Sequence, residues 1–136
     1  KTRTHTFTWD GVTPIRVTLA WTDPAGAAQT AADSRTPNLV HDLDLRLTAP
    51  DGVTATLPFV MPFVGTWTTA SMGLNATTGV NRVDNVEQVR VASPAQAGNY
   101  TVTVTLNGSL TTASQVYSLV VTGGTNVEAN PAPVVT

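Results

Sequence analysis

The acidic side chains of this 136-residue chain are few, and four of the nine lie in two short stretches that could bind a cation. Asp42 and Asp44 are two positions apart, so on a β-strand both side chains would leave the same face, about 7 Å apart. Unpaired like charges at that spacing are unfavourable, and Ca²⁺, which prefers oxygen ligands, would relieve the repulsion. The same spacing also fits an ordinary solvated strand face beside Arg46.

The second stretch contains Asp84 and Glu87. Glu87 shares its parity with Val89 and Val91 along an expected strand, so it is predicted to point toward the protein interior or its rim. A buried carboxylate needs a partner, which can be a metal ion, an arginine or backbone N–H groups. A β-bulge that turns the side chain outward is the alternative.

The remaining residues give little indication of a catalytic site. The histidines are His5 and His41, too far apart in the sequence for zinc-ligand spacing, and the chain has no cysteine. A Ser/His/Asp site using His41 is conceivable, but no serine lies in a Gly-x-Ser-x-Gly elbow. The glycine pair at 123–124 lacks the lysine of a phosphate-binding loop. The sequence therefore predicts that this chain is not an enzyme.

The segments that carry these residues alternate apolar and polar side chains with a period of two, which is typical of half-buried strands. Threonine, which favours pleated surfaces, occurs 25 times. Prolines 58 and 62 exclude a central strand at 57–65, and no window has a helical apolar stripe. We predict an all-β fold, an antiparallel two-sheet β-sandwich of seven to eight strands. The expected strands cover 4–9, 15–21, 42–48, 53–57 (as a hairpin with 42–48), 87–91, 100–106 and 116–122.

The core is predicted from the same alternation. It should contain Val17, Leu19, Trp21, Leu43, Leu45, Leu47, Tyr117, Leu119 and Val121.

Length and charge limit the function classes further. The length fits one domain, with the sandwich at 1–125 and a linker or tail at 126–136, where two prolines occur. A net charge of −2 with seven Lys and Arg argues against nucleic-acid binding. No apolar run approaches the roughly 20 residues of a membrane span. Absence of cysteine fits a secreted protein, and the start at Lys1 suggests a piece of something longer.

Five sequence blocks occur in an order that points to a known family. They resemble the C-terminal β-sandwich (jelly-roll) domain that follows the catalytic domain of many secreted subtilisin-like serine proteases, related in architecture to the P domain of kexin-like convertases. The resemblance covers about residues 4–124, and 117–123 (YSLVVTG) matches the usual last strand. The blocks are 19–24 (LAWTDP), 39–45 (LVHDLDL), 49–52 (APDG), 84–89 (DNVEQV) and 98–102 (GNYTV).

The resemblance implies a possible calcium site, because relatives bind calcium through acidic loop and strand residues. This chain departs from the family pattern at His41 and Asp84, where the family usually has asparagine. It also lacks the family's Gly-Asn pair after the Pro-Asp-Gly turn, and its stretch 58–78 diverges. The matching ligand positions are Asp23, Asp42, Asp44, Asp84 and Glu87.

The function that follows is a non-catalytic accessory domain of a secreted protease, which stabilises the catalytic domain or assists substrate access. Its expected partners are the catalytic domain of the parent protease and the protein substrate, with no nucleic acid and no membrane, and the domain is expected to be monomeric. The alternative is an extracellular carbohydrate- or protein-binding sandwich module. Trp67 is the candidate for stacking on sugar rings, although a tryptophan also serves as buried core filler.

Overall fold

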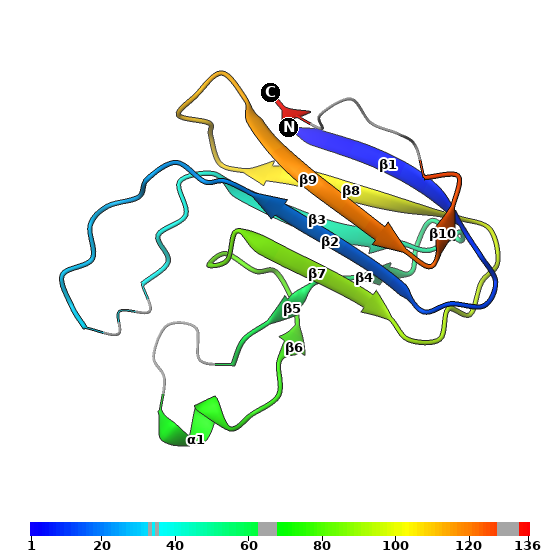
Figure 1. Ribbon diagram of the computed structural model, residues 1–136, viewed down its shortest axis with the longest axis horizontal. Helices are drawn as coiled ribbons and strands as arrows, with labels where there is room; N and C mark the ends of the chain where they lie inside the picture. The colour runs from blue at the N-terminus through cyan, green and yellow to red at the C-terminus, as the bar shows by residue number, and fades with distance from the viewer. Residues whose placement is uncertain (33, 35, 63–67, 128–133) are drawn as a thin grey trace.

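The computed structural model describes residues 1–32, 34, 36–62, 68–127 and 134–136. In this part of the chain the regular structure is almost all β-strand, and two antiparallel sheets pack against each other as predicted (Figure 1). The strands are β1 (Thr2–Trp9), β2 (Ile15–Trp21), β3 (Asp42–Thr48), β4 (Ala55–Thr56), β5 (Phe59–Val60), β6 (Thr77–Thr78), β7 (Val86–Val91), β8 (Asn99–Asn107), β9 (Gln115–Thr122), β10 (Gly124–Thr125) and β11 (Val134–Val135).

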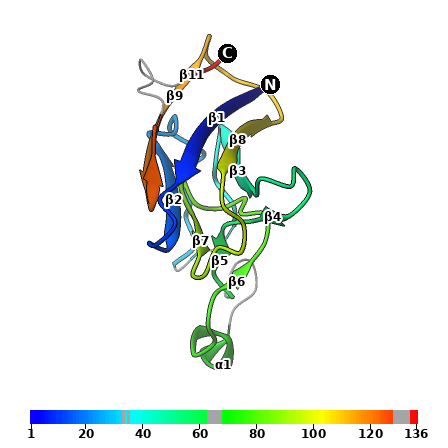
Figure 2. The same cartoon turned by 90° about the vertical axis from the view of Figure 1, so that its right-hand side faces the viewer.

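The larger sheet has the strand order β10-β1-β8-β3-β4, and the smaller one has the order β11-β9-β2-β7. Figure 2 shows the two sheets from the side, as the two layers of a sandwich. The six long strands and β4 correspond to the seven predicted strands, and β4 pairs with the end of β3 as the expected hairpin. The other strands in the described residues are two residues long.

Alternation along the strands fills the space between the sheets. Leu43, Leu45 and Leu47 of β3 are at most 1% exposed and belong to one buried cluster with residues of β2 and β8. The predicted core is confirmed, except that Leu119 and Val121 of β9 are only partly buried. Among the described residues, β11 pairs with β9 only at Gln115 and Val116, so the rest of that edge of β9 has no strand partner there.

The C-terminal residues extend the sandwich beyond the boundary predicted at residue 125. Val134 and Val135 form β11, which pairs with Val116 and Gln115 of β9, and Val135 is 1% exposed within the core. Arg3 Nε donates a hydrogen bond to the Val134 carbonyl at 2.9 Å. A strand of two residues after two prolines leaves no alternation to detect, so the sequence predicted a linker or tail here.

An arm, defined here as residues 58–62 and 68–80, projects from the sandwich (Figures 1 and 2). It contains the small β5–β6 sheet and one helical turn, α1 (Thr69–Met72). The turn was not predicted and is held by a capping box, in which Thr68 and Ser71 each accept the other's backbone N–H through the side-chain oxygen. No helix of the described residues has the length and apolar character needed to cross a membrane.

Candidate functional site

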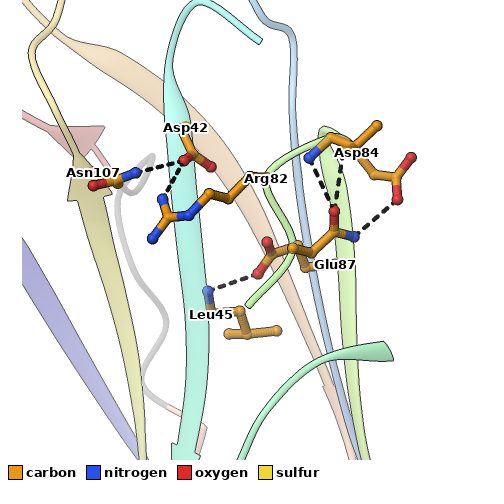
Figure 3. A network of polar contacts seen from close by, with 8 residues as sticks. Asp42, Leu45, Arg82, Asp84, Glu87 and Asn107 are labelled. Carbon is orange, nitrogen blue, oxygen red and sulfur yellow. Dashed lines mark hydrogen bonds and ion pairs between the residues drawn. The ribbon is translucent and has the colours of Figure 1, made fainter. Parts of the chain in front are cut away.

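Three of the five predicted acidic residues lie where β3 of the larger sheet contacts β7 of the smaller one. One edge of β3 pairs with β8 along its whole length, but its other edge pairs with β4 only at Leu47 and Thr48. Among the described residues, the first half of β3 therefore has no strand partner on that edge. β7 is the edge strand of the other sheet and contacts β3. Carboxylates from both strands lie in this region, as Figure 3 shows.

Glu87 of β7 is the buried member of the group. Its side chain is 1% exposed, which confirms the inward orientation predicted from parity. The Leu45 backbone N–H donates to Glu87 Oε2 at 2.7 Å, so this carboxylate takes the place of a missing strand partner on β3. Burial raises the pKa of Glu87 to about 8, although the Leu45 N–H acts to lower it; nearby Asp44 and Asp42 raise it further. Its Oε1 atom has no hydrogen-bond partner in the described part of the chain.

Asp42 and Asp44 of β3 lie on the same face, as their spacing predicts. Asp42 Oδ2 accepts hydrogen bonds from Arg82 Nη1 at 2.7 Å and from Asn107 Nδ2 at 2.8 Å. Burial raises the pKa of Asp42, and the Arg82 charge partly opposes that rise. The pKa of Asp44 is also raised, first by burial and then by the neighbouring Asp42. The Oδ1 atoms of both residues are buried and have no hydrogen-bond partner among the described residues.

Arg82, rather than Arg46, is the basic partner of this face. The Arg82–Asp42 ion pair joins the loop before β7 to the start of β3, with 50% of the Arg82 side chain and 16% of the Asp42 side chain exposed. Arg46 is exposed and forms no ion pair within the described residues. The alternative of a solvated face beside Arg46 does not describe the structure, because Asp42 is largely covered and paired elsewhere.

Asp23 and Asp84, the other two predicted ligands, lie in loops and have local partners. Both oxygens of Asp23 accept backbone N–H groups, from Val40 at 2.7 Å and from His41 at 2.8 Å. Asp84 Oδ2 accepts from Asn81 Nδ2 at 2.9 Å. These two side chains hold loops in place, while Asp42, Asp44 and Glu87 form what we call the carboxylate cluster.

The carboxylate cluster offers oxygen atoms of the type that calcium binds, and three of them lack partners. Nevertheless, no group of three histidine, aspartate or glutamate side chains in the described ranges is arranged to hold a metal ion. Of the five predicted ligands, Asp23 and Asp84 hold loops and Asp42 faces a guanidinium. Calcium binding stays a prediction.

His41 lies in a second polar cluster beside the first. It is fully buried, and its Nε2 accepts the Thr111 backbone N–H at 2.9 Å, so the ring proton is on Nδ1 and is donated to Gln115 Oε1 at 2.7 Å. Gln115 Nε2 in turn donates to the carbonyls of Thr22 and Val116. We call His41, Thr111 and Gln115 the histidine cluster. Both ring nitrogens are engaged inside the protein, which leaves neither for a general base.

The other histidine is also engaged within the core. His5 Nε2 lies 2.7 Å from the Tyr117 hydroxyl, and the two rings meet edge to face. The hydrolase alternative required a serine within reach of His41, but the hydrogen-bond partners described for His41 are Thr111 and Gln115. The sequence reasoning missed Arg82, Asn107, Thr111 and Gln115.

Two of the missed residues had a detectable signal. Gln115 shares the parity of Tyr117 and Leu119, so a polar residue on the inward side of β9 marked a need for buried partners. Arg82 lies five positions before Glu87, within the same motif region. Thr111 and Asn107 carry no such signal, because their contacts depend on how a loop and a strand end are placed in three dimensions.

A hollow of about 630 Å³ lies beside the histidine cluster, at the end of β2 and the start of β9, and Gln115 is one of its lining residues. Hydroxyl side chains line part of it, at Thr22, Thr112, Ser114 and Ser118. Trp67, the residue on which the carbohydrate-binding alternative depended, lies outside the described residues.

Comparison with known proteins adds no relative. No protein-family model matches the chain, and no curated protein is significantly similar to it in sequence.

Proposed function

We propose that this chain is a non-catalytic accessory domain of a secreted subtilisin-like serine protease, which stabilises the catalytic domain or assists substrate access. The observation that supports this proposal is the way in which the sequence blocks of the resemblance contact one another. Side chains from the first and fourth blocks bind backbone groups of the first and second blocks. The blocks therefore specify a framework rather than a set of reacting groups.

Three links make up this framework. Asp23, from the first block, binds the backbone of His41 in the second. Asn85, from the fourth block, donates to the Trp21 carbonyl at 2.8 Å, and the Trp21 N–H donates to the Asn85 carbonyl at 3.1 Å. Glu87, also from the fourth block, accepts the N–H of Leu45 in the second. The most distinctive residues of the resemblance thus hold β2, β3 and β7 together.

The arm supplies a surface through which such a domain could contact a larger protein. From Gly52 to Asn81 the sequence has no charged residue, although the chain contains 16 Lys, Arg, Asp and Glu in total. Apolar residues exposed together on a projecting element are typical of protein interfaces. The exposed ones on the arm are Phe59, Met61, Met72, Leu74 and Val80. We infer that the catalytic domain is the partner of this surface.

Two experiments test the proposal in sequence. The gene region upstream of the codon for Lys1 should encode a subtilisin-type catalytic domain with its Asp, His and Ser; a different neighbour would contradict the proposal. Mixing the purified chain with that catalytic domain should then raise the Tm of the catalytic domain. Substitution of Met72 and Leu74 by serine should abolish the increase, whereas substitution of Val12, an exposed valine in the β1–β2 turn, should preserve it.

The second candidate is an extracellular binding module, which the hydroxyl-lined hollow favours. Its test is retention of the purified chain on insoluble polysaccharides, compared with a Ser118→Arg variant that fills the hollow. Retention of the natural chain and loss by the variant would favour the module over the accessory domain.

A further inference from the structure

The two methionines of the chain both lie on the arm, and they contain all of its sulfur, because the sequence has no cysteine. Met61 directly follows β5, and Met72 is the last residue of α1. Their side chains are 43% and 50% exposed. Figure 2 shows α1 at the end of the arm farthest from the two sheets. An oxidant that reacts with sulfur therefore finds its two targets on one projecting element.

We propose that Met61 and Met72 are modification sites for peroxide, and that their oxidation to methionine sulfoxide releases the arm from its protein partner. The proposal rests on the function proposed above, in which the arm contacts the catalytic domain. It adds a control of that contact by the oxidation state of two sulfur atoms, while the sandwich keeps its fold.

The modification is a two-electron oxygen transfer from hydrogen peroxide. A lone pair of the thioether sulfur attacks one peroxide oxygen, and the S–O bond forms as the O–O bond breaks. The departing hydroxide takes the proton from the transferred oxygen and becomes water. Sulfur is oxidised and peroxide is reduced, so no other reactant is required. The product has a polar, chiral side chain in place of a flexible apolar one.

The surroundings of the two sulfur atoms make this change of polarity important. No residue from Gly52 to Asn81 is charged, so the arm offers its partner apolar contacts rather than ion pairs. The apolar residues exposed beside the methionines on the arm are Phe59, Leu74 and Val80. A sulfoxide oxygen buried against an apolar partner loses its hydrogen bonds to water, which is costly. Oxidation should therefore oppose docking of the arm.

Neither methionine supports the sandwich. Within the described part of the chain, the buried core and the residues packed against it include no methionine. The helical turn that contains Met72 is held by the capping box of Thr68 and Ser71, which does not use the methionine side chain. The oxidised chain should therefore have the same Tm as the natural chain when no partner is present.

Docking should in turn protect the two methionines. A partner that covers the arm keeps peroxide from the sulfur atoms, whose susceptibility follows their exposure. Oxidation of Met61 and Met72 should therefore be slower in the complex than in the free chain. Mass spectrometry of peptides from the two samples measures this difference.

The main test measures binding of the catalytic domain before and after the chain is treated with hydrogen peroxide, which is removed before mixing. The natural chain should gain two oxygen atoms, one for each methionine. It should then no longer raise the Tm of the catalytic domain, and its Kd should increase at least about tenfold, as when an interface loses apolar contacts at its centre. Repair by methionine sulfoxide reductases A and B should restore binding.

The control variants keep the apolar contacts or move the sulfur. Met61→Leu/Met72→Leu should bind the catalytic domain equally well before and after peroxide treatment. Adding Val12→Met to this double variant supplies the matched control, because Val12 is 86% exposed in the β1–β2 turn, outside the arm. The sulfur introduced there should be oxidised without any effect on binding.

The outcomes separate this inference from the proposed function. An untreated natural chain that does not bind the catalytic domain would contradict both. If it binds, equal binding after oxidation of both methionines would overturn this inference alone. A loss of binding by the peroxide-treated double variant would also overturn it, because another residue would then be responsible. If the double variant does not bind even before treatment, repair by the reductases decides, and oxidised natural chain that stays unable to bind after repair contradicts the inference.

Discussion

The carboxylate cluster and the histidine cluster begin at adjacent residues, Asp42 and His41, yet they are built in opposite ways. In the histidine cluster both ring nitrogens have partners, and the Gln115 amide is also satisfied. In the carboxylate cluster three buried oxygens have no hydrogen-bond partner within the described part of the chain, and one ion pair offsets the charges only in part. A satisfied neutral network specifies the structure, whereas an unsatisfied charged one responds to protons and cations. The capacity to respond to solution conditions therefore lies in the carboxylate cluster.

The largest effect on stability is expected where the carboxylate cluster meets the core. Leu45→Ala removes a side chain that is 1% exposed, and the loss should cost ~2–5 kcal/mol of unfolding free energy. The backbone N–H that binds Glu87 remains, so packing is lost while the cluster's hydrogen bond is kept. Urea denaturation measures the change. A loss below ~1 kcal/mol would show that packing of the Leu45 side chain contributes little to the stability of the core.

Breaking the satisfied network should have the next largest effect. His41→Ala leaves the Thr111 N–H and the Gln115 carbonyl oxygen buried without their partner, at a cost of ~2–3 kcal/mol. His41→Asn, which introduces the residue usual in the resembling family, should cost less because it keeps a donor and an acceptor. Equal losses for the two variants in urea denaturation would argue that packing alone, and not hydrogen bonding, matters at this position.

The unsatisfied cluster should make stability depend on pH. The pKa of Glu87 is about 8 in the folded state against an ordinary 4.5, so the folded chain keeps a proton that the unfolded chain loses. Its contribution is fully present below pH 4.5 and is lost as pH rises to about 8. Asp42, Asp44, Asp84 and Arg82 supply the charges around it.

Stability should therefore fall between pH 5 and 8, with a slope of up to ~1.4 kcal/mol per pH unit. Denaturation curves at several pH values measure the slope, which Glu87→Gln should flatten and His41→Asn should leave in place. Asp10 and Asp51 do not contribute to the change in stability between pH 5 and 8. Hydrogen bonds, the strongest of them from Thr13 to Asp10 and from Thr54 to Asp51, lower the pKa of both carboxyl groups below the ordinary 3.8. An unchanged slope in Glu87→Gln would assign the pH dependence to another group.

The smallest expected effect is none at all. The purified chain should leave casein and nitrophenyl esters uncut beyond background, because His41 has no free ring nitrogen to accept a proton. Activity that disappears in His41→Ala but persists in Arg46→Gln would make the histidine cluster a catalytic site and reverse the comparison.

Local patterns were enough to predict the sheets, the Leu43, Leu45 and Leu47 face and the inward direction of Glu87, because the side-chain period of a strand is fixed. Which side chains pair with one another could not be predicted in this way. Arg46 is nearer to Asp42 in the sequence than Arg82, but the loop before β7 is brought to β3 only by the packing of the two sheets. The same reason hid the partners of His41 and the pairing of β11.

The open edge of β3 has a further consequence, for solubility. An unpaired strand edge can pair with the edge of another molecule and begin aggregation. Here the Glu87 carboxylate already binds the Leu45 N–H, and Asp42 and Asp44 place negative charge along the same stretch. An incoming strand would have to displace a buried carboxylate and lie beside two more. We therefore expect the carboxylate cluster to hinder edge-to-edge pairing between two copies of the sandwich at the half of β3 that β4 does not pair with.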